Sequence, residues 1–126
     1  MRALLFLLIL SVLVACGGAP APTPATVEAA LTAAGGSAFA RGRIDGPVPQ
    51  SYTDHADFMI GDKGGQYFIC QDKDGCDALF AYYDALQFLA GPYLYRNQSG
   101  TVVVQLNSGL LPDEAAKYKD AVERLP

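Results

Sequence analysis

Two turn sequences constrain the fold of this chain more than any other feature. They are Asp62-Lys63-Gly64-Gly65 and Gln98-Ser99-Gly100. Aspartate and glycine accept the positive φ angles of tight hairpin turns, and the flanking segments contain the aromatic and β-branched residues that strands favour. The strands predicted on either side are residues 57–61 and 66–71 at the first turn, and 93–97 and 101–106 at the second. The sequence therefore predicts two β-hairpins, preceded by a further strand at 37–44.

Three segments have helical patterns. Thr26 can cap a first helix over residues 27–34, which Gly35 ends. In residues 76–90, apolar side chains recur at helical spacing, at Leu79, Tyr83, Leu86 and Ala90. Pro112 begins the last helix, at a position where its missing N–H costs nothing. The buried stripe predicted for that helix is Tyr118, Val122 and Leu125.

These elements follow the order α–β–ββ–α–ββ–α. Because hairpins dominate, we expect one α+β domain over residues 26–126, with a mostly antiparallel sheet of about four to five strands. In the strand 101–106, Val102, Val104 and Leu106 share one side, which predicts one core face and one wetter face. The three helices are accordingly expected to pack on one face of the sheet.

The N-terminal segment has the pattern of an export signal. Met1-Arg2 supplies a positive charge, and residues 3–14 are apolar except for Ser11. This run is shorter than the ~20 residues that a transmembrane helix needs, and its length is typical of a signal-peptide core. We therefore assign residues 1–15 to a signal peptide.

The end of this run, Leu13-Val14-Ala15-Cys16, resembles the lipobox of bacterial lipoproteins. The resemblance implies cleavage before Cys16, a diacylglyceryl thioether on its sulfur, and an extracytoplasmic location. Each buried methylene contributes ~0.8 kcal/mol, so two or more acyl chains hold a protein firmly in the membrane lipid. Because Gly17 follows the cysteine in place of aspartate, the resemblance also allows the outer membrane of a host that has one. An ordinary secretory signal or an uncleaved anchor is the alternative.

Residues 16–25 contain the lipidated cysteine and a small, uncharged, proline-rich segment. Alternating prolines favour extended polyproline II, so we interpret this segment as a tether. A ligand for a proline-recognition domain is the alternative. Two later stretches, 90–96 and 102–107, resemble small bacterial lipoproteins, a likeness that implies no activity.

Cys70 and Cys76 are the two cysteines left once Cys16 carries lipid. Export permits disulfides, and a bond here would join a strand end to a helix start. Catalytic redox pairs favour a C-x-x-C spacing, which is shorter than this one. We expect a structural disulfide, with free buried thiols or a redox or metal pair as alternatives.

The acidic loop around Cys76, Asp72-Lys73-Asp74-Gly75-Cys76-Asp77, resembles the start of a calcium loop. The EF-hand pattern needs a glutamate six residues after the glycine, where this chain has Ala81. We therefore expect Asp74 to cap a helix and Asp77 to lie in its first turn, with no metal and no other cofactor bound.

No catalytic pattern is evident around His55, the single histidine. A Ser–His–Asp set could be assembled on paper from the stretch Ser51-Tyr52-Thr53-Asp54-His55-Ala56-Asp57, but there is no Gly-x-Ser-x-Gly elbow. We expect His55 to lie on the surface, and we assign no catalytic residue.

Tyr93 and Tyr95 form a possible binding face, because residues two apart in a strand point to the same side. Tyrosines are common at interfaces. The simpler alternative places both rings under a helix.

The charge balance bears on partners. Nine Lys and Arg residues oppose 13 Asp and Glu, a net charge of −4, and a chain of this charge repels phosphate backbones, so no nucleic acid is expected. We expect a non-enzymatic module that binds an envelope protein or a small ligand. An envelope enzyme with a dispersed active site and a structural spacer lipoprotein are the alternatives.

Overall fold

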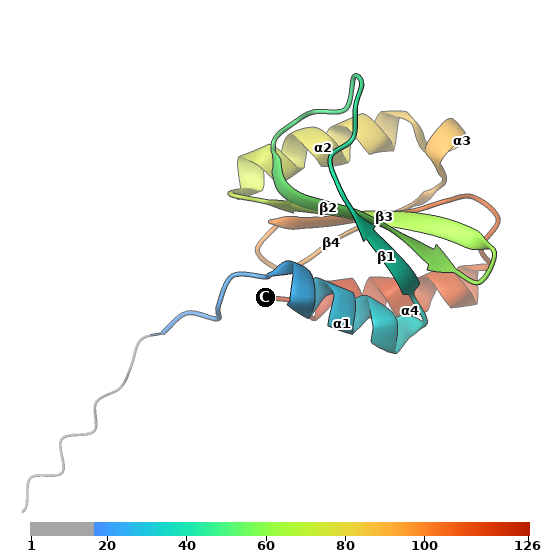
Figure 1. Ribbon diagram of the computed structural model, residues 1–126, viewed down its shortest axis with the longest axis horizontal. Helices are drawn as coiled ribbons and strands as arrows, with labels where there is room; N and C mark the ends of the chain where they lie inside the picture. The colour runs from blue at the N-terminus through green and yellow to red at the C-terminus, as the bar shows by residue number, and fades with distance from the viewer. Residues whose placement is uncertain (1–16) are drawn as a thin grey trace, which may run out of the picture.

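The computed structural model describes residues 17–126 as three layers, with helices on either side of a central sheet (Figure 1). The predicted signal peptide (residues 1–15) and the lipidation site Cys16 lie outside the described residues. Within 17–126 the elements are α1 (Pro24–Ala34), β1 (Ser37–Arg41), β2 (Tyr52–Ile60), β3 (Lys63–Cys70), α2 (Lys73–Ala85), α3 (Gln87–Ala90), β4 (Tyr93–Arg96), β5 (Val102–Leu106) and α4 (Pro112–Glu123). The predicted α+β class is confirmed.

The strands form one five-stranded sheet in the order β1-β2-β3-β5-β4, and every neighbouring pair is antiparallel. The two predicted hairpins are β2–β3 and β4–β5. The first turn is tighter than predicted, because Lys63 already pairs with Ile60 and leaves only Gly61 and Asp62 between the strands. Gly61 has a φ of 60°, which a glycine adopts without strain.

Helices cover both faces of the sheet, so the prediction that they pack on one face is wrong. On one face, α1 and α4 pack over a core that includes Tyr67 and Val104. On the other, α2 packs over Phe68 and Val103. The alternation in β5 is real, yet both sets of side chains are buried: Val103 and Gln105, assigned to a wetter face, are 0% and 1% exposed. The reason is the connection from β3 to β4, which passes over the second face as α2 and α3 (Figure 1).

Two helices begin earlier than the sequence predicted, because other residues cap them. Thr23, and not Thr26, caps α1 with its side chain, and Pro24 takes the first helical turn. α1 thus includes the last two residues of the predicted tether. Asp72, and not Asp74, caps α2. The single helix expected over 76–90 is broken at Leu86, whose backbone leaves the helical region (φ −104°, ψ 16°) and divides it into α2 and α3.

The last helix matches its prediction closely. α4 begins at Pro112, and its predicted stripe of Tyr118, Val122 and Leu125 is buried. This stripe belongs to the same core cluster as Val27 and Leu31 of α1. Figure 1 shows that the C-terminus lies close to the start of α1, while the β2–β3 turn lies at the opposite end of the molecule.

Candidate functional site

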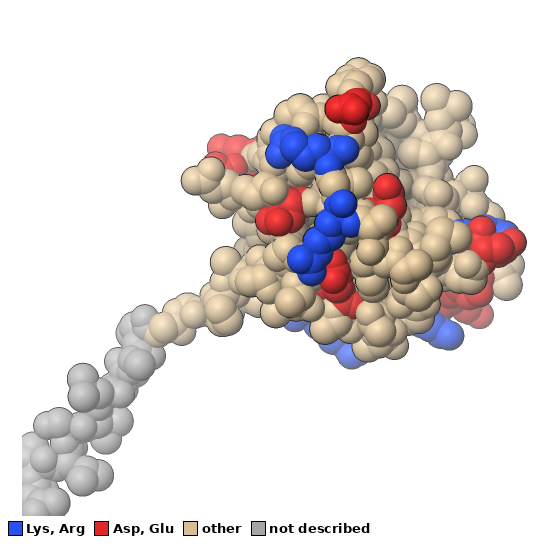
Figure 2. Space-filling view, in the orientation of Figure 1, with Lys and Arg blue, Asp and Glu red and all other residues tan. Residues whose placement is uncertain are grey.

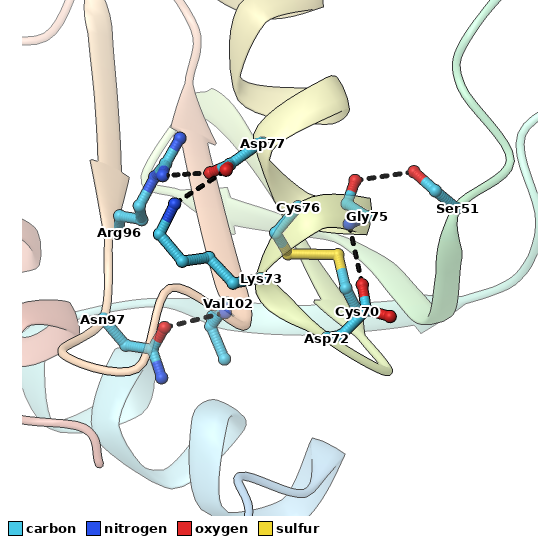
Figure 3. A network of polar contacts seen from close by, with 10 residues as sticks. All are labelled: Ser51, Cys70, Asp72, Lys73, Gly75, Cys76, Asp77, Arg96, Asn97 and Val102. Atoms are coloured by element: carbon cyan, nitrogen blue, oxygen red, sulfur yellow. Dashed lines mark hydrogen bonds and ion pairs between the residues drawn. A yellow bond between two sulfur atoms is a disulfide. The ribbon is translucent and has the colours of Figure 1, made fainter.

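A disulfide joins the end of β3 to the first turn of α2 (Figure 3). The Sγ atoms of Cys70 and Cys76 are 2.14 Å apart and their Cα atoms 5.6 Å apart. Both cysteines are buried in the core beneath α2. The bond closes a short ring, and it ties α2 to the sheet in the way that a structural disulfide would.

The start of α2 is built around Gly75. Its amide donates a 2.9 Å hydrogen bond to the Asp72 carboxylate, and its carbonyl accepts a 2.7 Å hydrogen bond from the Ser51 hydroxyl (Figure 3). A Cβ at this position would lie 2.8 Å from the Ser51 carbonyl oxygen. The close approach of Ser51 therefore requires glycine here. Ser51 and Asp72 are both used in holding the helix end.

Asp77 forms ion pairs with two cations. Its carboxylate lies 2.7 Å from Lys73 Nζ and 2.5 Å from Arg96 of β4, and the Arg96 guanidinium also lies 4.1 Å from the Phe80 ring centroid. The hydrogen bond from Lys73, followed by that from Arg96, lowers the pKa of Asp77. The ion pair between Asp77 and Arg96 thus joins α2 to β4. The carboxylates of Asp72 and Asp77 are already bonded to groups of the protein itself. Among residues 17–126, no three His, Cys, Asp or Glu side chains are grouped to hold a metal ion.

Asn97 ties the C-terminus to the β4–β5 hairpin. Its side-chain carbonyl accepts a 2.8 Å hydrogen bond from the Val102 amide (Figure 3), and its side-chain amide donates to the Pro126 carbonyl. Asn97 is buried, so these bonds satisfy polar atoms that water does not reach. This network is structural.

His55 is buried, so the prediction of a surface histidine is wrong. It lies among aromatic residues on the α2 face, with its ring centroid 4.9 Å from that of Phe68. Nδ1 donates a 2.8 Å hydrogen bond to the Gly42 carbonyl, since a carbonyl can only accept, and Nε2 lies 3.3 Å from Gln66 Oε1. Ser51 bonds to Gly75 instead, so the structure does not assemble a Ser–His–Asp set.

A chain of amides continues from His55 across the sheet. Gln66 Nε2 donates to Gln105 Oε1 at 2.9 Å, and Gln105 Nε2 donates to the carbonyls of Ala90 and Leu106 at 2.5 and 2.7 Å. These bonds hold the end of α3 against β5. The sequence did not single out either glutamine, because an amide on a strand predicts an exposed position as readily as a buried, paired one.

Tyr93 and Tyr95 share one face of β4, as predicted, and that face is the one covered by α4. Both rings are half-buried and pack against the core there. The Tyr93 hydroxyl donates a 3.1 Å hydrogen bond to the Leu110 carbonyl, and burial raises the pKa of Tyr95. This placement is that of tyrosines packed under a helix, and it favours the simpler of the two interpretations.

Open hollows lie along the outer side of the α1–α4 pair. One of them has a volume of about 260 Å³ and is lined by short alanine side chains together with Lys117, Asp120 and Arg124. Basic and acidic side chains are also interspersed on the face that Figure 2 shows. These hollows offer shallow contact with no enclosed set of polar groups.

The short helix α3 presents two large apolar side chains to solvent. Phe88 and Leu89 of α3 are 101% and 83% exposed. Their exposure could have been inferred from the sequence, because neither residue belongs to the apolar stripe predicted for residues 76–90.

No helix within residues 17–126 has the length and apolar character needed to cross a bilayer. No known protein family, curated protein or solved structure matches the chain.

Proposed function

We propose that this protein is a lipid-anchored, extracytoplasmic module that binds a partner without catalysing a reaction. The observation that supports it best is the Cys70–Cys76 disulfide. Disulfides persist in oxidising compartments and are rare in the cytosol. With these two cysteines joined, Cys16 is the cysteine left for lipid.

The segment that follows Cys16 supports a tether. Residues 17–23 have no helix or strand, and regular structure begins with α1 at Pro24 (Figure 1). At ~3 Å per residue in polyproline II, these seven residues reach ~20 Å. The lipid would thus hold the start of α1 close to the membrane, and Gly17 leaves the outer membrane open where the host has one.

The state of the polar side chains supports binding over catalysis. His55 is buried with both ring nitrogens against oxygens, and Asp77 is held by two cations. A general base or nucleophile must be within reach of a substrate atom, and His55 is 5% exposed. These groups act as structural ties, which leaves the outer surface for recognition.

The intact mass of the full chain, extracted in detergent, tests the anchor. We expect a mass of residues 16–126 plus diacylglyceryl, with or without an amide-linked acyl chain, and a gain of two hydrogens on reduction. The control is Cys16→Ala, which should lack the lipid mass and keep residues 1–15. An unlipidated mass for the unaltered chain, or a lipid mass on Cys16→Ala, would overturn the proposal.

A further inference from the structure

The large exposed apolar side chains of residues 17–126 lie at one end of the domain. They are Met59, Phe88, Leu89 and Leu111, which are 39%, 101%, 83% and 66% exposed. They belong to three segments, 57–66, 84–91 and 106–114, which we call the distal end.

Backbone contacts hold these three segments together. Gly65 pairs with Leu106 in the sheet, and the Asn107 amide donates a 2.9 Å hydrogen bond to the Gly64 carbonyl. Gly91, with a φ of 119°, lies so close to the loop after β5 that a Cβ there would be 2.7 Å from the Ser108 nitrogen. The apolar side chains are therefore displayed on one fixed scaffold.

The distal end lies opposite the tether. α1 starts at the tether and runs for 11 residues, or ~16 Å, toward this end. Ser37, three residues after the end of α1 at Ala34, pairs with Met59. In Figure 1 the chain enters at one end of the molecule, and the β2–β3 turn lies at the other.

The distal end also has most of the net charge of the processed chain. Its three segments contain one lysine, Lys63, and five acidic residues, which are Asp57, Asp62, Asp84, Asp113 and Glu114, so their sum is 1 − 5 = −4. Residues 16–126 have 8 − 13 = −5, because Arg2 is removed with the signal peptide, which leaves 7 − 8 = −1 for all other residues of the processed chain. Asp57 and Asp62 are 72% and 86% exposed, so this charge faces solvent. Figure 2 shows acidic side chains beside a basic one at the end away from the tether, and further acidic side chains elsewhere on the same face.

We propose that the distal end binds a cationic, amphipathic segment of a partner protein. Phe88 and Leu89 would anchor its apolar face, because burying exposed apolar side chains stabilises a complex, and the acidic rim would pair with its lysines and arginines. The rim repels a second copy of the same end, and it repels an anionic lipid surface. The inference rests on the proposed function only for its orientation, since the anchor turns this end away from the membrane.

Fluorescence of a single tryptophan tests the inference directly. The chain has no tryptophan, so Phe88→Trp places one reporter at the distal end of the full chain, which is transferred from detergent into vesicles of neutral lipid before any probe is added. The probe is a short peptide of leucine and lysine at helical spacing. The control peptide has glutamate in place of each lysine. In a third sample, anionic lipid vesicles are added without any peptide. Ala29→Trp, at an exposed position on α1, is the control variant.

We expect the lysine peptide to shift the Phe88→Trp emission to shorter wavelength and to leave Ala29→Trp unchanged. Adding Leu89→Ser should weaken this binding at least ~10-fold, and Asp57→Asn with Asp84→Asn should weaken it and reduce its salt dependence. No shift, an equal shift with the glutamate peptide, a shift with vesicles only, or a concentration-dependent shift without any probe would overturn the proposal. None of these results depends on the mass of the lipid. The binding proposal and the lipid-anchor proposal can therefore be refuted independently.

Discussion

The hydroxyl of Tyr67 donates a 2.7 Å hydrogen bond to Oε1 of Glu28, which ties the central strand β3 to α1. Arg41 of the edge strand β1 holds the same carboxylate through hydrogen bonds of 2.7 and 3.0 Å. The hydrogen bond from Arg41 lowers the pKa of Glu28, and burial raises that of Tyr67. Three elements far apart in the sequence thus meet at one carboxylate.

Glu28→Gln should lower the free energy of unfolding at pH 7 by about 1–2 kcal/mol, because it removes a charged hydrogen-bond acceptor. The folded pKa of Glu28 lies below its usual value of 4.5, so its stabilisation is present above that pH and is lost as the pH falls below it. Urea unfolding at several pH values should show the difference between the two proteins shrinking in acid. Asp45→Asn, in an exposed loop, controls for loss of charge alone. A difference that is independent of pH would contradict this account.

Tyr67 and Tyr118 provide a matched pair of hydroxyl deletions. Both tyrosines are buried, but the Tyr118 hydroxyl has no hydrogen-bond partner within residues 17–126, whereas that of Tyr67 bonds to Glu28. Tyr67→Phe should cost about 1.5–3 kcal/mol, since the bond is to a charged group. Tyr118→Phe should be neutral or slightly stabilising. Chemical denaturation of both variants checks this, and an equal loss in the two would refute it.

Removing the disulfide should destabilise the domain by about 2 kcal/mol, the loop-closure value for a ring as short as that between Cys70 and Cys76. Thermal unfolding of the Cys70→Ala, Cys76→Ala double variant should show a Tm lower by roughly 10 °C. Reductant should lower the Tm of the unaltered chain by a similar amount and leave the double variant unchanged. A reductant effect on the double variant would show that the disulfide is not the cause.

Replacing Ala38 with glycine should stabilise the protein. It has a φ of 52°, and no other non-glycine residue among those described has a positive φ. Ala38→Gly should therefore raise the free energy of unfolding by about 0.5–1 kcal/mol. Ala40→Gly in the same exposed strand should lower it by a similar amount, because that backbone is ordinary. Urea unfolding distinguishes the two, and a loss in both variants would show that Ala38 is not strained.

Local sequence patterns predicted the parts of the fold that short-range chemistry controls. Asp62, Gly64 and Gly65 indicated a hairpin, although both of these glycines lie within β3. Pro112 marked the start of α4, and the spacing of Tyr118 and Val122 identified its buried face. Each of these signals acts within one turn or one element, where φ preferences and periodicity are sufficient. The pairing of Cys70 with Cys76 followed from the small number of cysteines.

The helix ends depended on which of several similar residues acts as the cap. Thr23 and Thr26 are both competent, and Thr23 caps α1 while the Thr26 hydroxyl bonds back to it. Asp72 is chosen over Asp74 because Ser51, from a distant loop, holds Gly75 in the first turn. Sequence alone cannot choose between such neighbours, since the distant contact decides.

The sequence by itself determined the α+β class, the two hairpins and the apolar stripe of α4. Tertiary structure alone decided that both faces of the sheet are covered and that His55 is buried. The reason is that alternation in a strand records two faces but not what covers each. That depends on where a connection such as α2–α3 crosses the sheet, and on pairings such as Glu28 with Tyr67 that join residues distant along the chain.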